Sequence, residues 1–293
     1  MKIGIVTDDN SGFPQEISKK LGLYVIPMPI VIDGKDYFEN RTITSDEFYK
    51  LQAEGHSIHT AQPMIRDFYE VWDKALSEND QILFIGMSSG LTGAIDTAKT
   101  LAMDDKYVGK VFVVDNHRIS VTLRHSIYDA LAMVQEGLSA QEIQWELEAR
   151  AKESMIYIMV DTLEYLKRGG RITPAAAALG SVLNIKPVLK IEGGKLDAKS
   201  KQLGAQRVCA NMIKFMKDDL EGMFKGKENL AFAIAYTHNL EKAKLFRKQV
   251  SENFHVPEEK IMMDPLSLSV AVHIGPGALA IACSELYSKD EIQ

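Results

Sequence analysis

Hydroxyl and glycine residues are concentrated in one short segment, residues 88–93 (SSGLTG), which follows a predicted strand and precedes a predicted helix. Its three hydroxyl groups can donate hydrogen bonds, and its two glycines let the backbone approach a ligand closely. The free N–H groups at the start of the next helix favour a negative charge at the same place. The segment therefore indicates a site for a small anion, and a well-capped turn without a ligand is the alternative.

The same segment also fits a nucleophile turn of the serine hydrolases. Residues 86–90 read G-x-S-x-G between a predicted strand and a predicted helix, with Ser88 at the centre. Asp264 and His273 follow in the chain order Ser, Asp, His. The pattern is short and arises easily by chance, and no HGGG-type oxyanion loop precedes it. A serine hydrolase using Ser88 and His273 is thus the alternative to a binding protein.

Two further segments carry polar groups where the backbone is expected to turn. Residues 60–63 (TAQP) precede a predicted helix, and Thr60 and Gln62 can both hydrogen-bond a ligand or simply cap that helix. Residues 273–277 (HIGPG) place His273 at a predicted sharp bend rather than in the middle of a helix. A histidine in such a turn is a better candidate for function than an isolated core histidine.

The remaining polar clusters indicate less specific chemistry. Lys167, Arg168 and Arg171 lie at a predicted helix end, where they complement the helix dipole or dock an anionic partner. His56 and His59 have no HExxH, cysteine cluster or carboxylate triad beside them, so no metal site is predicted. The chain has no GxxxxGK[ST] loop. The hypothesis of a phosphate- or nucleotide-binding regulator is therefore supported only by the predicted helix start after residue 93.

Alternating strands and helices must position these loops in the first half of the chain. Predicted strands over residues 3–6, 82–87 and 110–115 alternate with amphipathic helical patterns such as residues 65–76. This order predicts a Rossmann-like parallel sheet with helices on both faces, and ligands bind such sheets beyond the carboxyl ends of the strands. Residues 24–32 and 36–38, joined around Gly34, are predicted to be extended segments or a hairpin.

The second half predicts a different α/β domain. Strands are expected over residues 155–161 and 230–236, with a hairpin turning at Gly193-Gly194, a helix over 174–183 and a longer helix over 205–224. We place the domain boundary near residue 153, which gives an N-terminal domain of residues 1–153 and a C-terminal domain of residues 154–293.

Composition excludes several classes of protein. The chain has 293 residues, 46% hydrophobic and 25% charged, which is ordinary for two globular domains. Its net charge of −6 disfavours nucleic acid and anionic membrane surfaces as partners. The apolar stretch from Pro265 to Leu286 is interrupted at residues 273–277, so we expect buried protein and no stable membrane insertion. Only Cys209 and Cys283 occur, no signal peptide is recognised, and a cytoplasmic protein is expected.

Taken in order, these segments resemble the DegV family of fatty-acid-binding proteins. The resemblance runs through the whole chain: Thr7-Asp8, Thr60-x-Gln62-Pro63, residues 88–93, residues 164–172 (EYLKRGGRI), residues 183–187 (LNIKP) and residues 273–277. It implies two α/β domains with a ligand tunnel between them, and a bound fatty acid such as palmitate, stearate or oleate. No single motif is decisive, but their order and spacing together are specific.

The resemblance also implies roles for residues. Thr60 and Ser89 would hydrogen-bond the carboxylate with His273 nearby, and we include Ser88 and Gln62 among the ligand-binding candidates. No catalytic residue, metal or cofactor is expected, because any phosphoryl transfer to form an acyl phosphate would belong to a partner fatty acid kinase. Lys167, Arg168, Arg171 and Lys201 are the candidates for docking that partner.

Three positions depart from the family pattern. Asp8-Asp9-Asn10 stands where Asp-Ser-Thr is usual, and Ala61 replaces the serine of Thr-Ser-Gln-Pro. Leu203, after Lys201-Gln202, replaces an arginine associated with phosphoryl transfer. This last departure puts the coupling to a kinase in doubt and affects lipid binding less.

Overall fold

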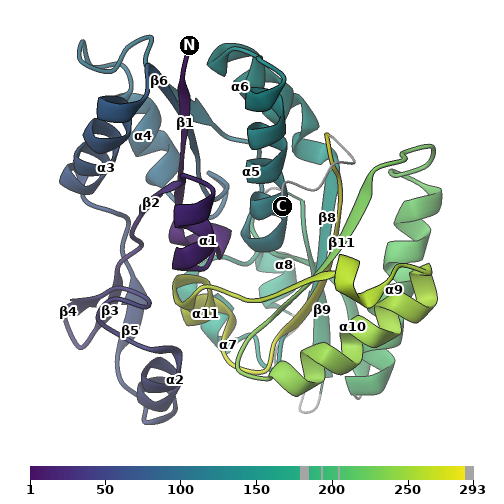
Figure 1. Cartoon of the computed structure of the whole chain (residues 1–293). Helices are drawn as coiled ribbons and strands as arrows, with labels where there is room; N and C mark the ends of the chain where they lie inside the picture. Colours follow the sequence, from purple (N-terminus) through teal and green to yellow (C-terminus); the bar gives the residue numbers. More distant parts are fainter. Residues whose placement is uncertain (179–184, 193, 204, 288–293) are drawn as a thin grey trace.

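The computed structural model describes residues 1–178, 185–192, 194–203 and 205–287, and it contains two large sheets side by side (Figure 1). The first is a four-stranded parallel sheet in the order β2-β1-β6-β7. Its strands are β1 (Ile3–Asp8), β2 (Tyr24–Ile26), β6 (Gln81–Ile85) and β7 (Val111–Val114). The predicted parallel sheet is therefore confirmed.

Helices cover both faces of this sheet because its buried residues alternate between two cores. Val6, Ile82 and Phe84 pack with α3 (Ile65–Glu78) and α4 (Ala94–Leu101). Ile5, Leu83 and Ile85 pack with α5 (Ser120–Gln135) and α6 (Ala140–Ala149) on the opposite face. The short helix α1 (Gln15–Lys20) follows β1 and the 3-10 turn η1 (Asp9–Ser11).

A small antiparallel sheet extends the first half of the chain at one end of the parallel sheet (Figure 1). The hairpin of β3 (Ile30–Ile32) and β4 (Lys35–Tyr37) turns at Asp33-Gly34, as predicted, and both turn residues have positive φ. The third strand, β5 (Ile58–Thr60), pairs with β3 and was not predicted. Helix α2 (Ser45–Ala53) precedes β5, and β5 brings Thr60 to the end of this sheet.

The second large sheet has six strands in the order β10-β9-β8-β13-β11-β12. They are β8 (Ser154–Met159), β9 (Ile185–Ile191), β10 (Asp197–Leu203), β11 (Leu230–Tyr236), β12 (Met262–Pro265) and β13 (Leu279–Glu285). Only β11 and β12 pair in parallel among these described strands. The predicted β9–β10 hairpin is confirmed, although Gly193 and residues 179–183 of the predicted helix lie outside the described residues.

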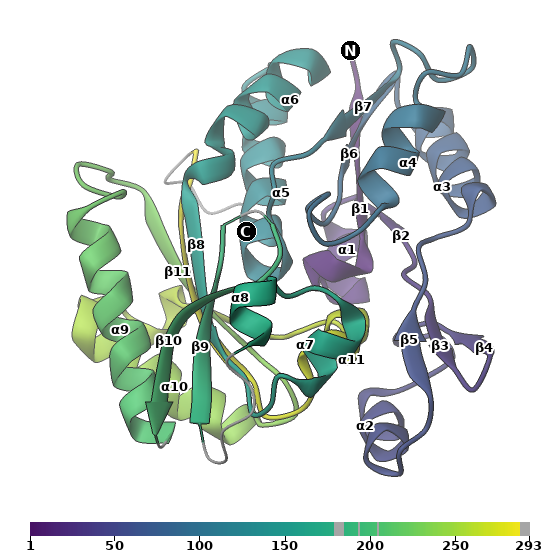
Figure 2. The ribbon, with the colours of Figure 1, turned by 180° about the vertical axis from the view of Figure 1, so that it is seen from behind.

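The two faces of the six-stranded sheet meet different layers. Helices α9 (Ala205–Glu221) and α10 (Leu240–Phe254) cover the outer face, as Figure 2 shows from behind. Helices α7 (Glu164–Gly169), α8 (Pro174–Ala177) and α11 (Leu268–Ile274) lie on the inner face, toward the first sheet. Helices η2 (Arg150–Lys152) and η3 (Glu258–Lys260) are single 3-10 turns. This two-part α/β fold is the one predicted.

Side chains from the two halves join across their boundary. Arg124 of α5 forms an ion pair of 2.7 Å with Asp264 at the end of β12. The Tyr287 amide donates to Asp129 of α5 at 2.9 Å, so the chain returns to the first half after β13. The boundary near residue 153 falls between η2 and β8, and we keep it as a proposal. In the described part of the chain, the helices are too short or too polar to cross a bilayer.

Candidate functional site

A cavity of about 240 Å³ lies between the two large sheets and is lined by residues from both halves of the chain. Most of its wall is apolar. The apolar side chains are Met28, Ala61, Met87, Leu91, Ile119, Val121, Ile156, Ile158, Leu166, Ile191, Leu196, Ala235, Leu266, Val270, Ile274 and Ala280. The polar ones are Thr60, Gln62, Thr92, Ser120, Arg171, Ser269 and His273. No carboxylate occurs among these lining residues, so the cavity suits an apolar ligand with a negative group.

Thr60 and His273 form one polar corner of the cavity. The Thr60 hydroxyl and the His273 Nε2 are 2.8 Å apart, which joins β5 to the last turn of α11 across 213 positions of sequence. His273 lies just before Gly275, whose positive φ ends the helix. His273 is the penultimate residue of α11, so it is helical and the predicted sharp bend begins two residues later, at Gly275. The structure brings this histidine together with Thr60.

Burial sets the charge of His273. Burial, together with the nearby positive charge of Arg171, lowers the pKa of the imidazole to about 4. The ring is therefore neutral at pH 7, and its buried Nδ1 has no hydrogen-bond partner in the described structure. A neutral imidazole beside a hydroxyl can accept a proton when a negative ligand arrives.

Glycines allow α7 and α11 to approach each other at this corner. A Cβ on Gly169 would collide with the imidazole of His273, and one on Gly275 would collide with the Tyr165 ring. A Cβ on Gly277 would likewise meet the Asp161 carboxylate. The segments 164–172 and 273–277, distant in sequence, thus pack closely against each other.

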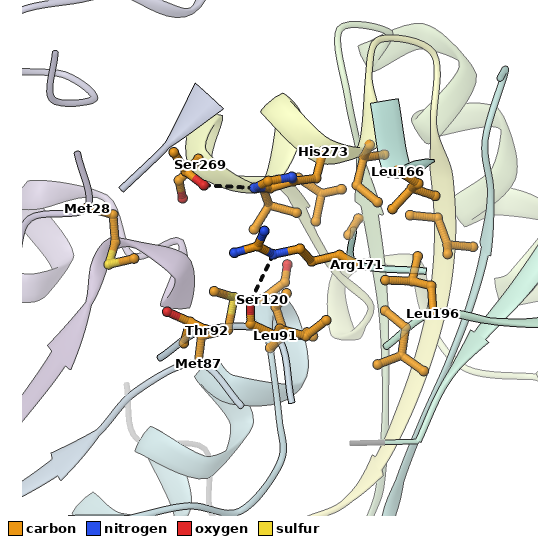
Figure 3. A pocket seen from close by; sticks show the side chains of 18 of the residues that line it. Met28, Met87, Leu91, Thr92, Ser120, Leu166, Arg171, Leu196, Ser269 and His273 are labelled. Carbon is orange, nitrogen blue, oxygen red and sulfur yellow. Dashed lines mark hydrogen bonds between the residues drawn. The ribbon is translucent and has the colours of Figure 1, made fainter. Parts of the chain in front are cut away.

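Arg171 is the cation of the cavity, although the sequence indicated a role in partner docking. Figure 3 shows its side chain extending between His273 and Ser120, with Met28 and Met87 on one side and Leu166 and Leu196 on the other. Its Nε donates to the Leu91 carbonyl at 3.3 Å, and its Nη1 donates to the Gly169 carbonyl at 2.5 Å. These two bonds hold the guanidinium in the cavity and leave further N–H groups for a ligand.

The other predicted docking residues lie away from the cavity wall. Lys167 and Arg168 are exposed on α7, where Arg168 packs over the Tyr165 ring with its guanidinium carbon 5.8 Å from the centroid. Lys201 lies in β10 opposite Pro187, and its side chain is outside the described part of the structure.

Ser88 and Ser89 do not line the cavity, whereas Thr92 of the same loop does. The Ser89 side chain bonds Asp115, and its amide donates to Asp115 at 3.3 Å. Burial acts to raise the pKa of Asp115, but the Ser89 hydrogen bonds and the charges of His117 and Lys99 lower it overall. Ser89 is therefore bonded to a charged carboxylate in this structure.

The structure does not assemble the residues of the alternative serine hydrolase. Ser88 is buried, its amide donates to the Arg118 carbonyl and its hydroxyl accepts from the Gly90 amide at 3.2 Å. Asp264 is paired with Arg124, while His273 bonds Thr60. The aspartate and the histidine of the expected triad thus have other partners.

Polar residues at the end of β1 and in the turn that follows it hold neighbouring segments of the site in place by hydrogen bonds. Asp8 is buried and accepts from the Met87 amide at 2.9 Å, which fixes the end of β6. Burial raises the pKa of Asp8 to about 6, against the hydrogen bonds from Met87 and Asn10. Asn10 Oδ1 accepts from the hydroxyls of Ser267 and Ser269 at 3.1 and 2.6 Å. Asn10, at a position where the family pattern has threonine, therefore holds a lining residue.

Sequence reasoning missed Ser120 and Ser269 as lining residues. Ser120 opens α5 with a positive φ and lies five residues beyond the predicted strand 110–115, at the edge of the sheet where ligands are expected to bind, so a signal existed. Ser269 lies in an apolar stretch and gave no signal of its own. Over the described ranges, no group of three or more metal-binding side chains comes together.

Comparison with known proteins identifies close relatives of this architecture. The family described as "Uncharacterised protein, DegV family" matches residues 2–286. A DegV domain-containing protein of Deinococcus radiodurans is 30% identical over 288 residues, which cover 98% of this chain and 99% of that protein.

Solved structures give the same result. A DegV family protein from Thermus thermophilus, described by its fatty acid binding, is 30% identical with a TM-score of 0.88, covering 98% of this chain and 100% of that one. A stearic acid-binding protein from Eubacterium ventriosum is 23% identical with a TM-score of 0.86, covering 97% and 99%, and this likeness concerns the fold.

Proposed function

Because the chain belongs to the DegV family, we propose that its cavity binds a long-chain fatty acid such as palmitate, stearate or oleate. The observation that carries the proposal is the composition of the cavity wall. One arginine, one histidine, one glutamine and several hydroxyls are set in an otherwise apolar wall, and none of the described lining residues is acidic. The related Thermus thermophilus protein, which is described by its fatty acid binding, supports the same ligand class.

The acyl tail supplies most of the binding free energy in this proposal. Burying roughly fifteen methylenes at about 0.8 kcal/mol each gives on the order of 12 kcal/mol. Association and ordering cost about 4–15 kcal/mol, so the affinity is useful rather than extreme. The apolar lining residues of the six-stranded sheet and of α11 provide the surface for this burial.

The carboxylate would lie among Thr60, His273 and Arg171. A buried carboxylate without partners costs several kcal/mol, and charge-assisted hydrogen bonds of about 1.5–3 kcal/mol each offset this cost. Gln62 lines the same cavity and can donate a further bond. Ser89 would join the head-group site only after its hydrogen bond to Asp115 is replaced by one to the ligand. Its neighbour Ser88, whose hydroxyl accepts from the Gly90 amide, would have to turn from that contact to do the same.

Lipid extraction tests the proposal directly. Protein expressed in bacteria should yield fatty acid by mass spectrometry of organic extracts, and should bind labelled palmitate or oleate. Met87→Glu places a carboxylate in the cavity and should abolish this binding, whereas Met87→Gln has the same size without the charge and should retain much of it. Empty extracts together with no binding of either label would refute the proposal. Labelling by a fluorophosphonate probe that Ser88→Ala abolishes would instead support the hydrolase.

We further propose that the protein is a cytoplasmic carrier without chemistry of its own, and that a partner kinase phosphorylates its ligand. Lys167 and Arg168 support this, because they are exposed on the helix that also supplies Leu166 to the cavity. Charge reversal at both positions should reduce kinase-dependent formation of acyl hydroxamate in the presence of ATP and hydroxylamine. Palmitate affinity should stay unchanged, and undiminished hydroxamate would remove these residues from the docking site.

A further inference from the structure

The six-stranded sheet has side chains of very different size on its two faces. Toward α9 and α10, the central strands β11 and β13 carry large residues: Phe232, Ile234, Leu279 and Ile281. Toward the cavity, the same two strands carry small residues: Ala233, Ala235, Ala280 and Ala282. Because side chains alternate along a strand, each alanine follows a large residue that points the other way.

Two of these alanines line the cavity. Ala235 lies directly opposite Ala280 in the β11–β13 pair, and Ala280 lies directly opposite Ile158 in the β13–β8 pair. All three line the cavity, and the two alanines are each 2% exposed. One row of side chains across β11, β13 and β8 therefore consists of two small residues followed by a large one. The space above the two alanines is part of the cavity because their side chains end at Cβ.

This row lies in the apolar part of the cavity. The polar lining residues come from the end of β5, from loops and from α5 and α11, whereas those supplied by the strands of the six-stranded sheet are apolar. A fatty acid with its carboxylate near Thr60 and Arg171 would therefore direct its tail toward the sheet. The volume above Ala235 and Ala280 is then available to methylenes of the tail.

We propose that Ala235 and Ala280 determine the length of acyl chain that the cavity accepts. The inference rests on the proposed function and adds the residues that select among its ligands. Valine at either position would fill space equivalent to about two methylenes. Because each buried methylene contributes a nearly constant free energy, long chains would lose affinity relative to short ones.

The test measures, for each variant, the ratio of its affinity for stearate to its affinity for myristate. Ala280→Val and Ala235→Val should each lower the affinity for stearate relative to myristate by about tenfold. Ala282→Val is the matched control, since Ala282 is a fully buried alanine on the same face of β13 that does not line the cavity. It should leave the ratio unchanged even where it lowers the thermal stability.

Each outcome is informative. The proposal would be overturned if the stearate-to-myristate affinity ratio were the same in Ala280→Val and wild type. It would also be overturned if Ala280→Val and Ala282→Val changed this ratio equally. Should the valine variants fail to fold, Ala280→Gly enlarges the same space and should raise the relative affinity for stearate; a lowered or unchanged ratio would overturn it. A wild-type protein that binds no chain length would instead refute fatty acid binding itself.

Discussion

The two hydroxyl-bearing loops that the sequence singled out use their hydrogen bonds differently. Thr60 lines the cavity and bonds His273, a neutral group from the other half of the chain. Ser89 lies outside the cavity wall and bonds Asp115, a charged group at the end of the adjacent strand. The partner of a hydroxyl, and not its residue type, therefore decides whether it is available to a ligand.

The difference has an energetic consequence for an anionic ligand. A carboxylate that approaches Thr60 can bond the hydroxyl while His273 remains beside it. A carboxylate that approaches Ser89 must replace Asp115, and a hydrogen bond to a charged acceptor is worth about 1.5–3 kcal/mol. The gain at Ser89 is thus reduced by the bond it gives up. Four experiments can sharpen or break this contrast.

Substitution of Arg171 should have the largest effect on fatty acid binding, because this side chain lies between the 88–93 loop and the Thr60–His273 pair. It bonds the Leu91 carbonyl in one loop and lies near His273, the partner of the other. Arg171→Met should weaken palmitate binding by about 30-fold, or about 2 kcal/mol, measured by fluorescence competition. Arg171→Lys, which keeps the charge, should fall between this variant and wild type.

Arg168→Met is the matched control for this experiment. Arg168 is also basic and also lies in the 164–172 segment, but it is exposed and outside the cavity wall. Its substitution should leave palmitate affinity unchanged. Equal losses in the two variants would show that long-range charge, rather than a group inside the cavity, attracts the ligand.

Removal of the Thr60 hydroxyl should have the next largest effect. Thr60→Val keeps the shape of the side chain and should weaken palmitate binding by about tenfold, or about 1.4 kcal/mol, since one charge-assisted donor is lost. Thr60→Ser keeps the donor and should remain within about twofold of wild type. If both variants bind as tightly as wild type, Thr60 is not part of the head-group site.

The framework that holds these loops could be predicted from the sequence. Apolar runs such as residues 82–85 and the helical spacing of Phe68 and Trp72 belong to buried strands and amphipathic helices, and both occur as expected. Strand β5 was missed because Ile58–Thr60 is three residues long, with an exposed His59 at its centre. Its pairing with β3 depends on tertiary contacts that no local pattern records.

The direction of polar side chains could not be predicted. Arg171 extends into the cavity because carbonyls of Leu91, 80 positions away, and Gly169 accept its N–H groups. Ser89 points to Asp115 because the ends of two neighbouring strands, β6 and β7, place them side by side. Residue type and spacing give the loop that carries a hydroxyl, whereas the partner follows only from the packed structure.

Substitution of Ser89 tests the contrast most directly and should have a smaller effect. Ser89→Ala should weaken palmitate binding by less than about threefold, because the ligand bond is gained only at the expense of the Asp115 bond. Ser88→Ala is the control at the neighbouring position, and its loss of palmitate affinity should not exceed that of Ser89→Ala. A loss at Ser89 equal to or greater than that of Thr60→Val would show that Ser89 leaves Asp115 when the ligand binds.

The smallest expected effect is a pH dependence of binding that comes from His273. Its pKa in the ligand-free protein is about 4, because burial and Arg171 disfavour the charged ring. A carboxylate bound beside Nε2 would raise this pKa, so binding takes up a fraction of a proton. Linkage then requires affinity to rise as pH falls, by about threefold or less between pH 8 and pH 6. Isothermal titration in two buffers of different ionisation enthalpy measures the uptake.

His273→Gln should remove this slope, since glutamine keeps a hydrogen-bonding group but cannot titrate. The difference between the two proteins isolates His273 from other groups that titrate in the same range, such as Asp8 and Glu39, whose pKa values burial raises to about 6 and about 7. Neither carboxyl lines the cavity, so both contribute equally to wild type and variant. An identical slope in both proteins would mean that the imidazole stays neutral beside the bound carboxylate, and that Thr60 and Arg171 alone hold the negative charge.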